Sequence, residues 1–189
     1  MKPLIVNFTN YKLAPLPSDA SSVITIQEGV KNIFQDEDVL KFHPERRLNT
    51  DNQVMYHLME TVTGYDNATR YDVFLTDKTR NECIAEIDII TNKGLLKYYP
   101  FFNEITKQHP EYKGTWLIEY YLDSRYWNNG MMSILIKKVI NHIFENGVKC
   151  ISAVTNKDNV ASERVLIKSG FQRSGMLNKD QTHWVLMQE

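Results

Sequence analysis

The sequence has few cysteines, and they are arranged in none of the usual cysteine motifs. Only two occur among the 189 residues, Cys83 and Cys150, and both lie inside apolar, strand-like runs. They form neither a CxxC pair nor a metal-ligand spacing. A disulfide framework is therefore not expected, and a reducing compartment fits the chain better.

Long apolar runs and blocks of like charge are also missing. No run approaches the length needed to cross a bilayer, and the apolar stretch at residues 4–8 is too short for a signal peptide. The formal net charge is −1, and charges of one sign do not cluster. Neither a membrane nor a nucleic acid is therefore expected as a partner, and we expect a cytoplasmic protein.

The chain does have the composition of an ordinary globular protein, with 42% hydrophobic and 24% charged residues. A length of 189 residues suits one domain with a full core. Internal repeats and Pro/Gly/Ser-rich linkers do not occur. We therefore predict that residues 1–189 form a single domain.

The first third of the chain predicts one strand and two helices. Residues 4–13 alternate weakly between apolar and polar and indicate a strand. Ser18 is the expected N-cap of the first helix. The second helix begins with a capping box formed by Thr50 and Gln53, and we expect Gly64 to end it.

The period then changes to that of strands. Residues 71–76 and 82–90 predict an antiparallel hairpin, and residues 116–122 predict a further strand rich in aromatic and branched side chains. Residues 91–113 combine five aromatic residues with two prolines and predict a loop with one short helix. Three roles stay open for the aromatic residues at 98–102: a lid over a substrate, a contact in a homodimer, or an anchor for the loop.

The second half predicts alternating strands and helices. Residues 130–145 have the clearest amphipathic pattern in the chain and predict a helix. A strand at 148–155, a helix capped by Asn159 and a hairpin of 171–177 with 182–188 follow. The predicted order is β-α-α-β-β-β-α-β-α-β-β, an α/β (or α+β) domain with a mixed sheet of about seven strands.

The junction between a strand ending at Leu122 and a helix opening at Gly130 carries the first chemical signal. A helix N-terminus presents unpaired N–H donors and partial positive charge to an anion. Gly130 has no Cβ that would keep an anion away, and no acidic residue occurs between Gly130 and Ile143. The junction therefore suits a phosphate, although a glycine there is also a common turn residue.

A second polar group comes at the start of the next helix. Asn156, Asn159 and Ser162 follow the strand at 148–155. These residues suit plain helix capping. Ser162 also suits a position on the entry face of the helix, toward the gap between strands. Both interpretations stay open on the residues alone.

Taken together, these segments resemble the core of the GNAT N-acetyltransferase superfamily. The matching motifs are Tyr-Trp-x-x-Gly at residues 126–130, Asn-x-x-Asn-x-x-Ser at 156–162 and Lys-x-Gly-Phe at 168–171. The similarity is greatest to the branch of ribosomal-protein alanine and serine N-acetyltransferases. It implies a mixed, mostly antiparallel central sheet flanked by helices, acetyl-CoA as the acetyl donor, and a reaction without a metal.

The resemblance also implies a cofactor site in three parts. Backbone amides of residues 128–132 would bind the pyrophosphate, and Tyr121 and Leu122 would pair with the pantetheine arm through their backbone. The polar group of the next helix would line the wall near the thiol, and Lys168 would approach the adenosine end. The cofactor-binding residues predicted in this way are Tyr121, Leu122, Trp127, Asn128, Asn129, Gly130, Met131, Met132, Asn156, Asn159, Ser162 and Lys168.

Acetyl transfer to an amine requires that the ammonium lose a proton and that the departing thiolate be stabilised. Glu119, on the strand expected beside the thioester, is the candidate base, and Ser162 is the candidate partner of the thiolate. His109 and His183 are alternative bases. Cys150 lies in an apolar strand and is expected to be buried and inert rather than a nucleophile.

The chain also departs from the family pattern. Trp127 stands where the superfamily usually has Gln or Arg, although the resembling branch often has Trp there, and Met132 stands where the superfamily has a small residue. Leu166 takes the place of a Tyr that acts as general acid in many relatives.

Two functions therefore stay open. One is an N-acetyltransferase that acts on a primary amine, either a protein N-terminus or a small molecule, by direct attack in a ternary complex. The other is a non-catalytic acyl-CoA-binding module with a regulatory role. A different nucleotide-binding protein is disfavoured, because neither GxGxxG nor GxxxxGK[ST] occurs.

Overall fold

A computed structural model describes residues 1–188, and the chain divides into two compact units. Unit 1 contains Met1–Ile89 and Tyr120–Asn129, and unit 2 contains Ile90–Glu119 and the chain from Gly130 onward. The expectation of a single domain stays a prediction.

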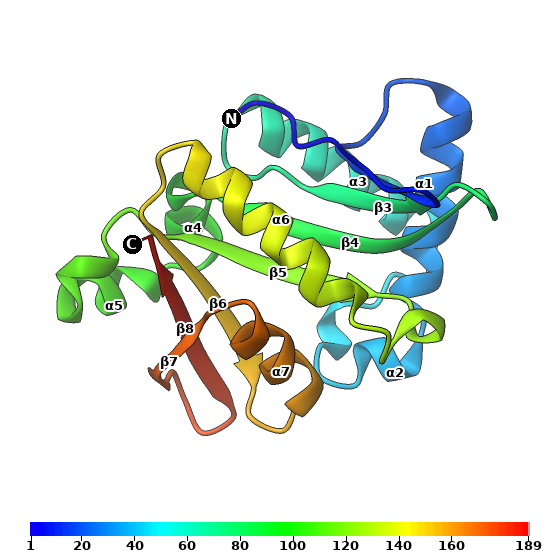
Figure 1. The fold of residues 1–189 in the computed structure, drawn as a ribbon. Coiled ribbons are helices and arrows are strands. Elements are labelled where there is room, and N and C mark those ends of the chain that lie inside the picture. The colour runs from blue at the N-terminus through cyan, green and yellow to red at the C-terminus, as the bar shows by residue number, and fades with distance from the viewer. Residues whose placement is uncertain (189) are drawn as a thin grey trace. The chain divides into compact units, whose positions relative to one another are not determined.

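The described residues form eight strands and seven α-helices (Figure 1). The strands are β1 (Val6–Asn7), β2 (Tyr11–Ala14), β3 (Val73–Asp77), β4 (Glu82–Ile90), β5 (Trp116–Leu122), β6 (Cys150–Asn156), β7 (Gln172–Met176) and β8 (Gln181–Met187). The helices are α1 (Ala20–Ile33), α2 (Glu37–Leu40), α3 (Asp51–Asp66), α4 (Asn92–Tyr98), α5 (Phe102–Gln108), α6 (Met131–Glu145) and α7 (Val160–Lys168).

The strand order is β1-β2-β3-β4-β5-β6-β8-β7. The pair β5–β6 is parallel, whereas β1–β2, β2–β3, β3–β4, β6–β8 and β7–β8 are antiparallel. This confirms the predicted α/β fold with a mixed, mostly antiparallel sheet. The extra strand arises because residues 4–13 form the hairpin β1–β2 rather than one strand, with Val6 paired to Leu13.

In unit 1, α1 and α3 cover one face of β3 and β4 (Figure 1). Their apolar sides close a core of Ile26, Val30, Ile33, Phe34, Leu40, Val54, Leu58, Phe74, Cys83 and Tyr121. Gly29 sits in the middle of α1 because a Cβ there would lie 2.2 Å from the carbonyl oxygen of Cys83. The close approach of helix to strand therefore explains a glycine that weakened the helical pattern.

Of three helix signals predicted in unit 1, one is confirmed and two were wrong. The capping box of Thr50 and Gln53 is present at the start of α3. The N-cap of α1 is Asp19 rather than Ser18, because the Asp19 carboxylate accepts from the backbone N–H of Ser22 at 2.9 Å. Gly64 does not end α3, which continues to Asp66; its missing side chain makes room for Arg70.

A bulge in the β3–β4 hairpin prepares the site. Leu75 pairs with Ala85 and Thr76 pairs with Cys83, so β4 carries one extra residue, Ile84. The carbonyl oxygen of Ile84 accepts a hydrogen bond from the backbone N–H of Asp123 at 2.9 Å. The bulge thereby holds the first residue after β5.

In unit 2, residues 91–113 contain two helices, α4 and α5, and a 3-10 turn at Pro110–Tyr112, so the prediction of one short helix was wrong. Thr91 caps α4 by accepting from the backbone N–H of Gly94 at 3.2 Å. Apolar side chains then decide the structure of the segment. They form a cluster of Ile90, Leu95, Phe102 and Leu117, against which Tyr99, Ile105 and Val154 pack.

The predicted helices of the second half are confirmed. α6 buries one apolar face, and α7 begins at the expected cap, Asn159. Gly147, with φ +84°, follows the end of α6. Within residues 1–188, no helix is both long enough and apolar enough to span a bilayer.

Candidate functional site

The chain leaves β5 through a short, tightly bonded loop in unit 1. A 3-10 turn at Ser124–Tyr126 begins with Asp123, whose carboxylate accepts from the backbone N–H of Arg125 at 2.9 Å. The indole Nε1 of Trp127 donates to the carbonyl oxygen of Leu122 at 2.8 Å. Trp127 thus ties the loop back to the end of its own strand, which gives a physical role to a residue that departs from the superfamily pattern.

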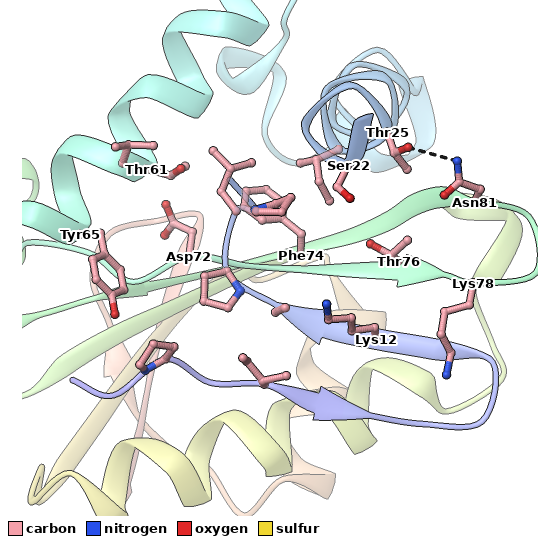
Figure 2. Close-up of a pocket in the computed structure, with 18 of the residues that line it drawn as sticks. Lys12, Ser22, Thr25, Thr61, Tyr65, Asp72, Phe74, Thr76, Lys78 and Asn81 are labelled. Carbon is pink, nitrogen blue, oxygen red and sulfur yellow. Dashed lines mark hydrogen bonds between the residues drawn. The ribbon is translucent and has the colours of Figure 1, made fainter. Parts of the chain in front are cut away.

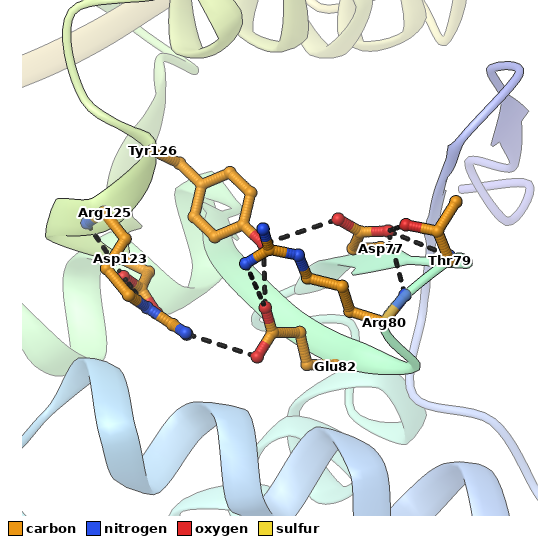
Figure 3. A network of polar contacts seen from close by, with 7 residues as sticks. All are labelled: Asp77, Thr79, Arg80, Glu82, Asp123, Arg125 and Tyr126. Atoms are coloured by element: carbon orange, nitrogen blue, oxygen red, sulfur yellow. Dashed lines mark hydrogen bonds and ion pairs between the residues drawn. The ribbon is translucent and has the colours of Figure 1, made fainter.

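A polar network attaches this loop to the β3–β4 hairpin (Figure 3). The hydroxyl of Tyr126 donates to Oε1 of Glu82 at 2.7 Å. Arg125 forms ion pairs with Asp123 at 2.6 Å and with Glu82 at 3.2 Å. Burial and the bond to Glu82 raise the pKa of Tyr126, so its hydroxyl stays a donor at neutral pH. The network therefore holds the loop that carries Trp127 and Asn128.

Sequence reasoning missed Glu82. Glu82 begins the predicted strand at residues 82–90, but nothing in the pattern indicated that its carboxylate would meet a tyrosine 44 positions further along the chain. The bulge at Ile84 was equally invisible, because register depends on the partner strand.

The backbone of the loop takes conformations that favour glycine. Asn128 has φ +62°, in the left-handed region that asparagine tolerates better than most residues. Gly130 has φ +77° and is the N-cap of α6. A Cβ at Gly130 would meet no atom within 4 Å, so the glycine is required by its backbone angle and not by crowding.

The N-terminus of α6 is suited to an anion. No side chain caps it, and no acidic residue lies in its first turn, which begins with Met131 and Met132. Because the first N–H groups of a helix lack intrahelical acceptors and carry the positive end of the dipole, a phosphate is favoured there.

The polar residues near α7 hold local structure. The side-chain oxygen of Asn156 accepts from the backbone N–H of Asp158 at 2.9 Å, and that of Asn159 accepts from the N–H of Ser162 at 3.1 Å. These bonds favour the capping interpretation for both asparagines. Ser162 is half-buried in the first turn of α7, and Lys168 is exposed in its last turn.

The parallel ladder between β5 and β6 ends early. Among the described residues it pairs Trp116 with Ile151 and Leu117 with Ser152, although β6 continues to Asn156. Glu119 lies two residues beyond the last pair and is half-buried. Its carboxylate Oε1 accepts a hydrogen bond from the hydroxyl of Tyr99 at 2.8 Å.

His109, an alternative base, has a side chain that is 45% exposed and lies 3.2 Å from the carboxylate of Glu111, whereas His183 and Cys150 lie in the interior of unit 2. His183 is only 3% exposed and bonds Ser152 at 3.0 Å. Burial, aided by the charge of His109, lowers the pKa of His183 to about 4. The thiol of Cys150 is also buried, and burial raises its pKa, so the expectation that Cys150 is buried is confirmed. Leu166 is fully buried in the core.

Tyr121 and Leu122 at the end of β5 lie in unit 1 with Trp127, Asn128 and Asn129. The Tyr121 side chain is buried against Phe34, at 4.8 Å between ring centroids, which leaves only its backbone for a ligand. The other predicted site residues, Glu119, Gly130, Met131, Met132, Asn156, Asn159, Ser162 and Lys168, belong to unit 2.

A pocket of about 510 Å³ lies in unit 1 among α1, α3, β2 and β3 (Figure 2). None of the predicted site residues lines it. Asp72 at its edge is ion-paired with Arg70 at 2.6 Å.

Asp72, Glu86 and Asp88 are close enough to share a metal ion. Cations of the chain already occupy these carboxylates, however. Arg70 pairs with Asp88 at 3.1 Å as well as with Asp72, and His57 pairs with Glu86 at 2.7 Å. The group therefore fits a network of buried ion pairs better than a cation site.

The fold and the helix terminus describe a mixed α/β protein suited to a phosphate-bearing ligand. A family model for the acetyltransferase (GNAT) domain matches residues 15–172. The chain therefore belongs to the GNAT acetyltransferase family.

Similar proteins agree with this assignment. An uncharacterized N-acetyltransferase of Bacillus subtilis, YoaA, is 41% identical over 63 residues, a stretch that spans 33% of this chain and 36% of that protein. The ribosomal-protein-S5-alanine acetyltransferase of Vibrio fischeri has a similar fold, with a TM-score of 0.69 at 17% identity over 97% of this chain and 96% of that chain. RimL, a ribosomal α-N-protein acetyltransferase solved in complex with coenzyme A, has a TM-score of 0.70 at 18% identity over 97% and 98%.

Proposed function

We propose that the chain transfers an acetyl group from acetyl-CoA to a primary amine, either a protein N-terminus or a small molecule. The observation that carries this proposal is the uncapped N-terminus of α6, opened by Gly130 in a left-handed conformation and free of acidic residues in its first turn. The family assignment and a structural relative that binds coenzyme A support the same donor.

In this proposal the first turn of α6 binds the pyrophosphate through backbone N–H groups, from Gly130 to Met132. Asn128 and Asn129 extend this backbone cradle, and the backbone of Tyr121 and Leu122 meets the pantetheine arm. Asn156, Asn159 and Ser162 line the wall near the thiol, and Lys168 lies toward the adenosine end. The side chains of both asparagines already bond backbone N–H groups, so their contribution is to shape the wall.

The donor supplies an acyl group activated as a thioester. The ammonium first loses one proton to the base, which passes it to solvent. The amine nitrogen then bonds to the carbonyl carbon, the carbon–sulfur bond breaks, and the second proton of the attacking nitrogen ends on the sulfur of coenzyme A. Glu119 is the proposed base, acting directly or through a water, and Ser162 is the proposed hydrogen-bond partner of the thiolate. We place the reaction in the cytoplasm, because both cysteines are free and buried.

One observation favours the alternative of a non-catalytic acyl-CoA-binding module. Leu166, fully buried, offers no hydroxyl at the position where many relatives carry a catalytic tyrosine. The test measures binding and turnover separately. Calorimetry with acetyl-CoA reports binding, and thiol release across a panel of peptides and small amines reports transfer. Tight binding with amine-dependent thiol release supports the enzyme, and tight binding without release for any amine supports the module.

A further inference from the structure

Residues 91–113, for which one short helix was predicted, place a tyrosine against the proposed base. Tyr99 ends α4, and its hydroxyl reaches the carboxylate of Glu119 at 2.8 Å. The two residues are 20 positions apart and come from different elements of unit 2.

The backbone of Tyr99 is held on both sides. Its N–H donates to the carbonyl oxygen of Leu95 at 2.8 Å, and its own carbonyl oxygen accepts from the N–H of Phe102 at 3.0 Å. Its ring packs on the apolar cluster and meets Phe101 edge-on, with 6.0 Å between centroids. With the backbone and ring fixed in this way, the hydroxyl has little freedom to point elsewhere.

The carboxylate of Glu119 lies where it needs a hydrogen-bond donor. Side chains alternate along a strand, so Glu119 lies on the same face of β5 as Leu117, a member of the apolar cluster. A half-buried carboxylate beside apolar side chains is costly without a hydrogen-bond donor. A neutral hydroxyl meets that need without neutralising the charge that a base requires.

We propose that Tyr99 is a positioning residue that orients the Glu119 carboxylate for proton abstraction from the acceptor amine. The inference rests on the proposed function, in which Glu119 is the base. In this proposal residues 91–113 contribute to catalysis, because Tyr99 is the C-cap of α4 and its hydroxyl reaches Glu119.

The hydrogen bond has a consequence for the pH profile. A donor to a carboxylate favours its charged form, so the loss of the donor shifts the protonation of that carboxylate to higher pH. His183, which packs against Phe102 and Tyr112 in the same unit, has a pKa of about 4 and stays neutral at the pH values where an amine acetyltransferase is assayed. The change in the protonation of Glu119 is therefore expected in the acid limb of the profile of kcat/KM against pH.

The test compares Tyr99→Phe with Tyr98→Phe in the full chain, using acetyl-CoA and the best amine of the panel. Tyr98 is the neighbouring exposed tyrosine and loses the same atom without touching Glu119. Tyr99→Phe is expected to lower kcat about tenfold and to move the acid limb of kcat/KM upward by about one pH unit, with unchanged acetyl-CoA affinity. Tyr98→Phe is expected to retain the wild-type profile.

Glu119→Gln separates the two levels of inference. If Glu119→Gln abolishes transfer and Tyr99→Phe leaves both kcat and the pH profile unchanged, Tyr99 has no positioning role although the proposed base stands. If Glu119→Gln retains full activity, the proposed base is wrong and the role of Tyr99 with it. The double variant also reports the bond itself: Tyr99→Phe is expected to lower the melting temperature of the wild type and to have a smaller effect on Glu119→Gln.

Discussion

The hydroxyl of Tyr126 donates to Glu82 Oε1 at 2.7 Å, and this bond connects the loop after β5 to the first residue of β4. The loop carries Trp127, whose indole closes it onto Leu122. Two hydrogen bonds, one to a neighbouring strand and one to its own strand, therefore hold the segment that leads into α6.

Removal of the Tyr126 hydroxyl is expected to loosen this segment. Tyr126→Phe loses one hydrogen bond, while Glu82 keeps its ion pair with Arg125, so we expect the free energy of unfolding to fall by about 1 kcal/mol. A comparable loss of loop order would weaken acetyl-CoA binding about fivefold. Chemical denaturation and calorimetry measure the two effects. Tyr56→Phe is the control, because Tyr56 is 70% exposed. If Tyr126→Phe has the acetyl-CoA affinity and the stability of the wild type, the role of this bond is contradicted.

Substitution of Gly130 tests whether the N-terminus of α6 binds the cofactor, and the same substitution at Gly114 controls for backbone strain. Gly130 and Gly114 have similar backbone angles, φ +77° and +81°, and a Cβ would meet nothing within 4 Å at either position. Valine at each is expected to cost about 1–2 kcal/mol of stability through left-handed strain. Only Gly130→Val is expected to weaken acetyl-CoA binding, by about tenfold or more, because in the proposed site the pyrophosphate approaches the N–H groups there. Equal affinities for the two folded variants would remove the helix terminus from the cofactor site.

His183 is expected to limit stability in acid. Burial lowers its pKa to about 4 from the ordinary 6.5, so the unfolded chain binds a proton in this range that the folded chain does not. The contribution of neutral His183 to the free energy of unfolding is therefore complete above pH 6.5 and is lost as the pH falls toward 4. The slope of unfolding free energy against pH between these values should be smaller in His183→Gln. A slope identical to that of the wild type would show that His183 titrates normally.

His57 is expected to act at the opposite end of the pH range. Burial opposes its charge, but the carboxylate of Glu86 at 2.7 Å prevails and raises the pKa of His57 to about 9. Its contribution to stability is present below pH 6.5 and is lost as the pH rises through 9. His57→Gln should therefore be less stable at pH 6 and should lose less stability than the wild type between pH 7 and 9. Thermal unfolding across this range measures both, and His43→Gln, at an exposed ion pair, is the control.

Much of the local structure was predictable because its signals lie within a few residues of each other. The capping box of Thr50 and Gln53 was confirmed, as were the bounds of β4 and β5. The amphipathic pattern of α6 set its extent to within one residue. One failure was a choice between neighbouring residues, in the cap of α1, where Asp19 and not Ser18 accepts the first bond. Others concerned whole elements, since residues 91–113 contain two helices rather than one.

The sequence by itself thus determined the alternation of helices and strands, the glycine at the start of α6 and the motifs by which the family is identified. Tertiary structure alone decided the partners. It brought Glu82 to Tyr126 and Tyr99 to Glu119, and it turned an aromatic segment into two helices packed on an apolar cluster. The physical reason is the separation along the chain of the residues that interact. Caps and periodicity depend on residues a few positions apart, whereas the partner of a buried polar group depends on which strands pair and in which register.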